Sequence, residues 1–345
     1  MHFAAAGFSY AAPAMSAAPD PLAHPQVRFA YTETGARLAR VQVAHALPGL
    51  PFRMTRRGRR WELVAPQPDV TRLEYQFELI DEAGGSTWIV DPANPLRASG
   101  PWGDKSVLEL PGYEPPVWLD DEPVGTLEET TIPSKILHAE LPALLWAHPD
   151  AHAGSPLLVA LDGPEYAEHS SLVTLLGRLP PLRAALIGPV DRNEIYSASA
   201  RHARALADEI LPALGRAPLT IGLGASLGGL ALLHTHRRHP ESFDALFLQS
   251  GSFFRRRDRH EAGFPRFDRI SRFVGSTLTR KPERPIAITI ACGTVEENFA
   301  SNLAMFEALR RQGYDARFQE FRDGHNWVAW RDSLHPHLLR LLQRA

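Results

Sequence analysis

The second half of this chain alternates short apolar runs with segments of helical spacing, and this alternation restricts the fold more than any other feature. The apolar runs that predict buried strands are LLVALD, AALIGPV, LTIGL, ALFLQS and AITIAC. Helices are expected at residues 171–179, 198–214, 227–239, 268–278, 300–312 and 327–342. Strands joined by crossover helices form a mostly parallel sheet with helices on both faces. We therefore predict an α/β domain, opened by an antiparallel hairpin whose strands are KILHAEL and ALLWAHP, residues 135–141 and 143–149.

Residues 219–230, LTIGLGASLGGL, join one of these strands to its helix through a tight turn. The turn has the pattern G-x-S-x-G, in which small residues let the backbone fold sharply and lift a serine hydroxyl clear of the sheet. Ser226 is therefore a candidate nucleophile. The alternative is a small-residue turn that only packs the helix on the strand, so the motif needs chemical partners.

Two such partners follow Ser226 along the chain, each in a loop after a predicted strand. A serine hydroxyl needs a base, and an acid must orient that base. His325 lies in RDGHNW after the strand ARFQEF, and Glu296 lies in GTVEEN after AITIAC, with Glu297 as the second choice. A lone histidine in a loop is usually only solvated. The order serine, acid, histidine at successive strand ends favours the catalytic interpretation.

The remaining metal-binding and thiol side chains favour structural roles. His234, His236 and His239 share one helix, but residues two apart point to different faces, so at most His236 and His239 could share an ion. A basic helix C-terminus that complements the helix dipole explains these histidines better. Cys292 is the only cysteine and ends an apolar run, which predicts a buried, unreactive thiol. We predict no metal and no organic cofactor.

The first third of the chain has a different pattern: short segments in which apolar and polar residues alternate are separated by turn residues. These segments predict an all-β sandwich. The turn RRGRR, residues 56–60, is expected to be a solvated hairpin tip. The predicted organisation is a disordered leader (residues 1–25), a β-sandwich (26–114), a linker rich in Pro and Gly (115–126) and the catalytic domain (127–345).

The charge and hydropathy pattern excludes several classes of partner. The net charge of −2 gives no overall attraction to nucleic acid or to anionic membranes. No run of about 18 apolar residues predicts a membrane span. The first residues lack the basic start of a secretion signal, so we expect a cytoplasmic protein.

Several segments beyond the serine turn resemble one known family. They are LDG, DRNEIY, EILPAL, GASLGG, QSGSFF, GTVEENFASN and DGHNWVAWRDSL, and they occur in the order that this family shows. Residues 126–345 resemble the enterochelin esterases, hydrolases of trilactone siderophores in the α/β-hydrolase group. The N-terminal sandwich is similar to the immunoglobulin-like domain that precedes the hydrolase in cytoplasmic members. The resemblance implies an α/β-hydrolase fold, with Ser226 as nucleophile, His325 as base and Glu296 as acid.

The resemblance also implies a substrate pocket beside these residues. The expected substrate-binding residues are Arg192, Tyr166, Phe253, Phe254 and Arg255, although an ion pair that holds the loop is the alternative role for Arg192. Arg255 opens the basic segment RRRDRH, which would attract an anionic substrate or would be only an exposed loop.

An esterase of this kind also needs two backbone N–H donors for the oxyanion. Leu227 supplies one of them. The second comes from the loop after LLVALD, where Pro164 cannot donate, which leaves Gly163 or Glu165.

The sequence thus predicts a serine carboxylic-ester hydrolase that uses a Ser-His-Glu triad on a small-molecule ester, such as an iron-loaded siderophore lactone. Two alternatives stay open. One is a carbohydrate-ester esterase or acyltransferase on the same scaffold. The other is a binding protein that keeps the fold without turnover. The sequence leaves the oligomeric state open.

Overall fold

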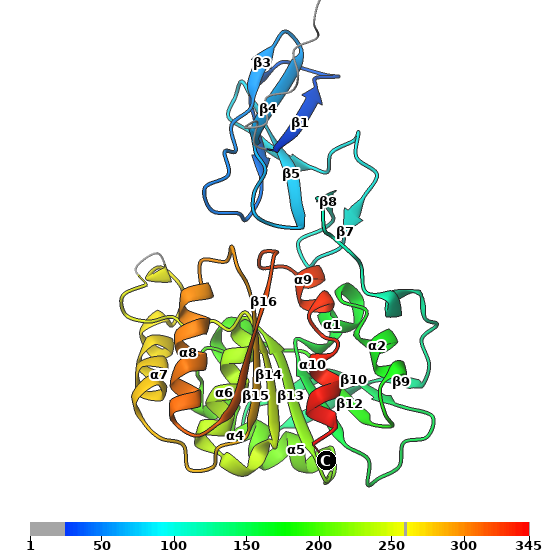
Figure 1. Ribbon diagram of the computed structural model, residues 1–345, viewed down its shortest axis with the longest axis vertical. Helices are drawn as coiled ribbons and strands as arrows, with labels where there is room; N and C mark the ends of the chain where they lie inside the picture. The colour runs from blue at the N-terminus through cyan, green and yellow to red at the C-terminus, as the bar shows by residue number, and fades with distance from the viewer. Residues whose placement is uncertain (1–24, 259–260, 345) are drawn as a thin grey trace, which may run out of the picture.

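A computed structural model describes residues 25–258 and 261–344 (Figure 1), so the predicted leader lies outside the described residues except for Pro25. The described chain forms an N-terminal region of strands and a larger region of strands and helices. The strands of the N-terminal region are β1 (Gln26–Thr32), β2 (Leu38–Ala44), β3 (Thr55–Arg57), β4 (Arg60–Pro66), β5 (Arg72–Asp81), β6 (Ser86–Ile89), β7 (Arg97–Ala98) and β8 (Lys105–Glu109).

The N-terminal region consists of two antiparallel sheets around one apolar core. One sheet has the order β1-β4-β3, and the other has the order β2-β5-β8-β7, with β6 paired to β5. Alternate residues of these strands point inward, so Phe29, Val41, Trp61, Tyr75 and Phe77 are buried together. Two packed sheets agree with the expected sandwich, whereas the immunoglobulin-like class and the domain boundaries remain predictions.

The larger region is built on an eight-stranded sheet with the order β16-β15-β14-β13-β11-β12-β10-β9. Strands β11 to β16 are parallel to one another, and β10 is antiparallel to both of its neighbours, β12 and β9. This arrangement confirms the predicted mostly parallel sheet with an antiparallel opening. The strands are β9 (Thr126–Ser134), β10 (Ala139–Ala147), β11 (Leu157–Leu161), β12 (Arg183–Ile187), β13 (Thr220–Ala225), β14 (Ala245–Gln249), β15 (Ala287–Gly293) and β16 (Asp315–Phe321).

Helices cover both faces of this sheet (Figure 1). One face carries α4 (Ala200–Ala205), the π-helical η2 (Leu206–Ile210), α5 (Leu211–Ala213), α6 (Leu227–Arg238), α7 (Phe267–Thr279) and α8 (Phe299–Arg311). The other face carries η1 (Val117–Asp120), α1 (Gly163–His169), α2 (Leu172–Arg178), α9 (Trp327–Asp332) and α10 (His337–Leu342). Short helices α3 (Arg192–Ile195) and η3 (Pro240–Ser242) lie in connections. The sheet is therefore buried on both faces, which explains its nearly uninterrupted apolar strands.

Two predicted elements were wrong in position. The opening strand was expected at 135–141, but β9 starts at Thr126 and the segment after Ser134 forms the turn into β10. Because β9 is the sheet edge, it tolerates exposed charges and Pro133, which hide its strand pattern. The last helix was expected to run from Trp327 to Leu342, but Pro336, which has no N–H to donate, lies between α9 and α10.

The N-terminal region lies over the end of the central sheet at which α9 begins (Figure 1). The backbone N–H of Thr71 donates to the carbonyl oxygen of Arg322 at 2.8 Å. Ala98 and Val107 pack on Val328 of α9. The carboxyl ends of the parallel strands meet at this end of the sheet, so the N-terminal region covers the edge where catalytic loops are expected.

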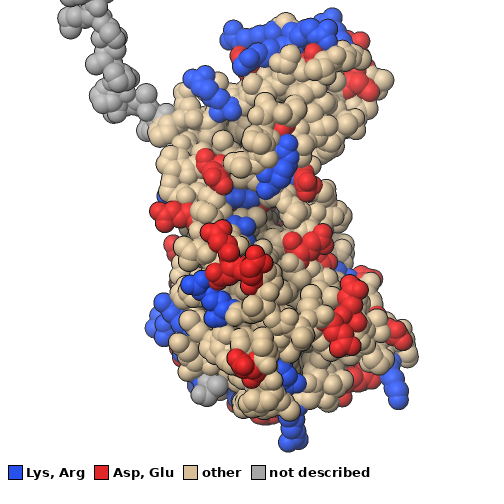
Figure 2. Space-filling view, turned by 90° about the vertical axis from the view of Figure 1, so that its right-hand side faces the viewer, with Lys and Arg blue, Asp and Glu red and all other residues tan. Residues whose placement is uncertain are grey.

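The RRGRR turn lies far from that edge. It is the tip of the β3–β4 hairpin, and the blue group at the top of Figure 2 lies over it. The side chains of Arg57 and Arg60 are largely exposed and pair with Glu62. This solvated hairpin tip is therefore not part of the pocket described below.

Candidate active site

The serine turn places Ser226 between β13 and α6 in a strained backbone conformation. Its φ of 55° and ψ of −119° are rare for a residue with a side chain. Its N–H donates to the carbonyl oxygen of Gln249 at 2.8 Å. A Cβ on Gly224 would lie 2.7 Å from the carbonyl carbon of Gly228, so the turn can close only over glycine. The local sequence thus fixes Ser226 at the carboxyl end of β13.

His325 and Glu296 meet at the carboxyl ends of β16 and β15. Oε2 of Glu296 lies 2.6 Å from Nδ1 of His325. The other oxygen, Oε1, accepts from the hydroxyl of Ser250 at 2.7 Å and from the N–H of Gly293 at 2.8 Å. The indole of Trp330 donates to the Ser250 oxygen at 3.0 Å and packs edge-on against the imidazole. These contacts hold the carboxylate on Nδ1 and leave Nε2 of His325 for another partner.

The geometry separates the two candidate acids. The side chain of Glu296 is almost fully buried and contacts His325 directly. Glu297 is exposed on the same loop. Sequence reasoning gave no role to Ser250 or Trp330, although both lie inside the segments QSGSFF and DGHNWVAW that carried the family resemblance.

Ser226 and His325 line one pocket of about 460 Å³, which we call the active-site pocket. Oγ of Ser226 lies 3.1 Å from Oγ of Ser252. The N-terminal region closes the other side with residues 99–103 and Lys105, and the side chain of Trp102 is 89% exposed. Sequence reasoning did not include this segment, because it lies more than a hundred residues from the serine and has no catalytic motif.

Three charged side chains also line this pocket: Asp162 and Glu165, which follow β11, and Arg192 of α3, which follows β12. Arg192 holds both oxygens of Asp162, at 2.8 and 2.7 Å. Arg192 therefore lines the pocket and is also ion-paired, with Asp162 and not with the Glu194 of its own turn. Burial, and the charge of Asp162 with it, raises the pKa of Glu165, one of whose oxygens is buried without a hydrogen bond.

The three predicted oxyanion donors occupy two adjacent helix starts. Leu227 is the first residue of α6, whose first-turn N–H groups have no partner within the helix. Gly163 and Glu165 belong to the first turn of α1. The two turns touch, since a Cβ on Gly228 would lie 3.3 Å from the Asp162 carboxylate.

Of the five predicted substrate-binding side chains, Arg192 lines the active-site pocket and the other four do not. Tyr166 is fully buried and donates its hydroxyl proton to Gln249. Phe253 and Phe254 belong to the apolar core on the α6 face of the sheet. The guanidinium of Arg255 donates two hydrogen bonds to the carboxylate of Asp258 in the same loop. From the sequence alone, aromatic residues near a serine turn can either line a pocket or pack in the core. Here they pack in the core.

The histidines of α6 are also corrected in their role. His234 packs edge-on against Phe273, and His236 packs against Tyr314. Burial lowers the pKa of His234 to about 3 and that of His236 to about 4. They are therefore neutral core side chains and not charges that complement the helix dipole.

Within residues 25–258 and 261–344, no three or more His, Cys, Asp or Glu side chains come together in a way that could hold a metal ion. None of the helices described there is both long and apolar enough to cross a membrane.

Known proteins resemble this chain in both sequence and fold. Residues 194–341 match the family of putative esterases. The iron(III) enterobactin esterase of Dickeya dadantii is 31% identical over 205 residues, which are 54% of this chain and 47% of that protein. The iron(III) enterobactin esterase of Escherichia coli O6:H1 is 28% identical over 81% of this chain and 72% of that protein. The chain thus spans about half the length of the first relative and more of the second.

A crystal structure of the enterobactin esterase of Shigella flexneri, in the presence of enterobactin, superposes with a TM-score of 0.75. It is 22% identical, and the match covers 92% of this chain and 93% of that one. The strand order and this likeness show an α/β-hydrolase-like fold, and the family model that matches the second half of the chain is that of putative esterases. The curated relatives and the solved structure named here are enterobactin esterases, and the chain resembles them in both sequence and fold.

Proposed function

We propose that this protein is a serine esterase in which Ser226, His325 and Glu296 form the catalytic triad. The observation that supports this most is the 2.6 Å contact between buried Glu296 and Nδ1 of His325, in a pocket that His325 shares with Ser226. A histidine oriented in this way presents Nε2 as the base for a serine hydroxyl.

The proposed reaction has two steps. First, the Ser226 side chain rotates, so that its hydroxyl leaves Ser252 and donates its hydrogen bond to Nε2 of His325. Oγ of Ser226 then attacks the ester carbonyl carbon and its proton passes to Nε2. The tetrahedral intermediate collapses, the alkoxide leaves with that proton, and the acyl group stays on Ser226. Water attacks the acyl-enzyme, gives its proton to Nε2 and releases the acid, and the proton returns to Ser226.

Gly163 and Leu227 are the proposed oxyanion donors. Leu227 follows the nucleophile at the start of α6. Pro164 has no N–H, and the N–H of Glu165 lies against its own carboxyl group. Gly163 is the remaining donor at the start of α1, and any Cβ there would meet the backbone of Leu186 at 2.0 Å.

The proposed substrate is a siderophore lactone or a similar ester, with or without bound iron. The enterobactin esterases that this chain resembles support this choice. Arg192 and Lys105 in the active-site pocket could face an anionic group of such a ligand, although both are already paired with carboxylates. A cytoplasmic location is part of the same proposal.

The test compares the protein with its Ser226→Ala variant on ethyl butanoate, on trilactone siderophores with and without iron, and on feruloyl and acetyl sugars, with products identified by mass. We expect siderophore turnover that the variant loses. Turnover retained by Ser226→Ala contradicts the proposed nucleophile. Turnover of the sugar esters alone would favour a carbohydrate esterase. Failure of a fluorophosphonate to label Ser226 would favour a binding protein without turnover.

A further inference from the structure

A groove of about 940 Å³, which we call the basic groove, lies on the face of the central sheet that carries α4, α6 and α7. Neither Ser226 nor His325 lines it. Five arginines line it against two acidic residues, although the whole chain has a net charge of −2, so the positive charge is a local feature. These charged residues are Arg201, Arg238, Arg269, Arg272, Arg280, Asp191 and Glu194.

Two helices turn side chains toward this groove. Its residues on α7 are three or four positions apart, so they form one stripe along the helix. They are Arg269, Arg272, Phe273 and Ser276, and Arg280 follows at the helix end. On α6, His234 and Arg238 are also four positions apart. The ring of His234 contacts that of Phe273 edge-on, with centroids 4.8 Å apart, so the two stripes meet.

Four of the five arginines have no acidic partner. The carboxylate of Glu194 accepts from Arg269 at 2.7 Å and also from Arg266, and the carboxylate of Asp191 accepts from the N–H of Glu194 at the start of α3. In the part of the chain that the structure describes, no carboxylate pairs with the exposed side chains of Arg201, Arg238, Arg272 and Arg280. The groove therefore holds positive charge that the protein itself does not neutralise.

His234 is a buried imidazole that lines the same groove. It is only 6% exposed, and its ring has no hydrogen-bond partner among residues 25–258 and 261–344. Burial lowers its pKa to about 3, and the positive charges of Arg238 and Arg269 add to this, so the ring is neutral and keeps one N–H. Buried polar groups normally have a partner, and a ligand oxygen in the groove would supply one.

The groove is rich in hydrogen-bond donors. A guanidinium has five N–H donors and no acceptor, and the hydroxyl of Ser276 and the N–H of His234 add further donors. A planar carboxylate is satisfied by one guanidinium, which binds both of its oxygens. A phosphate group carries more charge and three acceptor oxygens that point in different directions, which suits donors from two helices better.

We infer that the basic groove binds a multiply charged phosphate, either free or as the phosphoryl group of a small organic molecule. Arg238 of α6 and Arg272 of α7 bind its oxygens from their two helices, and His234 donates to it from α6. This site is separate from the active-site pocket and does not depend on the proposed esterase reaction.

Isothermal titration calorimetry with inorganic pyrophosphate, at neutral pH and an ionic strength of about 0.15 M, tests this inference. We expect one site with a Kd of about 10–100 µM. Arg238→Met and Arg272→Met should each weaken binding by about tenfold, because each removes charge-assisted hydrogen bonds. The matched control is Arg204→Met: Arg204 is exposed on α4 but does not line the groove, and the loss of its screened charge should change Kd by less than about twofold.

NMR of the histidine rings locates the bound anion. The signal of His234 is identified by its loss in His234→Gln, and pyrophosphate should shift it in the native protein. Glycerophosphate and citrate are titrated in parallel. Tighter binding of pyrophosphate indicates free phosphate as the ligand, and tighter binding of glycerophosphate indicates an organic phosphate. Citrate should bind more weakly than both.

The inference is overturned if pyrophosphate shows no saturable binding or if neither Arg238→Met nor Arg272→Met weakens it. Equal weakening by Arg204→Met overturns it too, because the effect is then one of overall charge. An unshifted His234 signal means that the anion binds elsewhere, and citrate that binds as tightly as the phosphates contradicts the class of ligand. Thermal unfolding at the native temperature shows that each variant is folded.

Discussion

The carboxylate of Glu296 accepts three hydrogen bonds, from His325, Ser250 and Gly293, while it is almost fully shielded from water. A buried carboxylate needs such partners, since burial without them costs several kcal/mol. Its orientation is therefore fixed before a substrate arrives. In the proposed mechanism this fixed carboxylate selects the tautomer of His325 with the proton on Nδ1.

Replacing Glu296 with Gln should lower kcat by about 10²- to 10⁴-fold. The amide nitrogen cannot accept a hydrogen bond from Nδ1, so the imidazole is no longer held in the tautomer with its proton on Nδ1. KM for ethyl butanoate should change little. The matched control is Glu297→Gln on the same loop, which should stay within twofold. A larger loss in Glu297→Gln than in Glu296→Gln would reverse the assignment of the acid.

A second prediction concerns Asp323, two residues before the histidine. Burial raises its pKa from 3.8 to about 7, so the folded protein favours the neutral carboxyl. The stability that this neutral group contributes is fully present below pH 3.8 and is lost as the pH rises through about 7. Between pH 3.8 and about 7, the free energy of unfolding of the native protein should therefore fall by up to about 4 kcal/mol relative to that of Asp323→Asn.

Urea denaturation at several pH values measures this difference. Asp69→Asn, at an exposed site, is the control and should follow the native protein. Identical pH dependence in the native protein and Asp323→Asn would contradict the raised pKa.

At the scale of elements, the turn between β13 and α6 depends on close approach of two backbones. Gly224 and Gly229 are in contact, and a Cβ on Gly229 would lie 3.0 Å from the carbonyl oxygen of Gly224. The helix start and the strand end are thereby held together without intervening side chains.

Gly224→Ala should destabilise the protein by about 1–3 kcal/mol and lower activity, because backbone atoms of Gly228 cannot move as a flexible side chain would. Gly275→Ala is the matched control. Gly275 is exposed within α7 and a Cβ there meets nothing within 4 Å, so alanine should stabilise by about 0.5–1 kcal/mol. Thermal unfolding of both variants measures the contrast, and a neutral Gly224→Ala would show that the turn can relax.

The sequence predicts those elements whose burial is complete, and it fails where burial is partial. Strands β11 to β15 are mostly apolar, and the sequence predicts all of them. Edge strand β9 was missed because its charges and proline do not alternate clearly. Ser226, His325 and Glu296 follow strand ends and could be predicted from that position. Trp102 could not, because its approach to the site depends on how the two regions pack.

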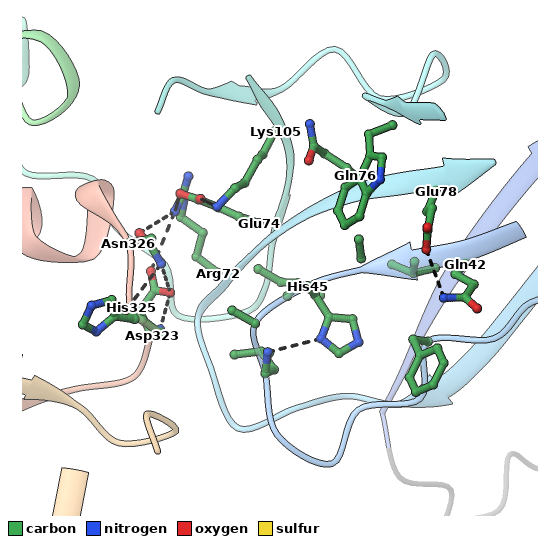
Figure 3. A pocket seen from close by; sticks show the side chains of 18 residues that line it. Gln42, His45, Arg72, Glu74, Gln76, Glu78, Lys105, Asp323, His325 and Asn326 are labelled. Carbon is green, nitrogen blue, oxygen red and sulfur yellow. Dashed lines mark hydrogen bonds and ion pairs between the residues drawn. The ribbon is translucent and has the colours of Figure 1, made fainter. Parts of the chain in front are cut away.

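At the scale of the whole molecule, Arg72 connects the two regions at the histidine loop. Its side chain is only 3% exposed and reaches Glu74 at 2.9 Å, Asn326 at 3.4 Å and Asp323 at 3.8 Å. Figure 3 shows this group beside His325. The position of the proposed base therefore depends on a residue of the N-terminal region.

Arg72→Met should lower kcat for ethyl butanoate by about tenfold with little change in KM, because it frees the loop that carries His325 while leaving the serine side of the pocket intact. Arg322→Met removes an exposed pair with Asp69 across the same junction and should cost less than twofold. Steady-state kinetics of both variants decide this, and equal effects would mean that Arg72 only holds the regions together.

The segment 99–105 that roofs the active-site pocket belongs to a different region of the chain from the nucleophile beneath it. Mutations in that roof can alter which molecules are accepted while the reacting atoms keep their positions. Evolution can therefore change substrate preference without changing the catalytic residues. Exchanging the N-terminal sandwich between two relatives is a direct way to transfer substrate preference from one to the other.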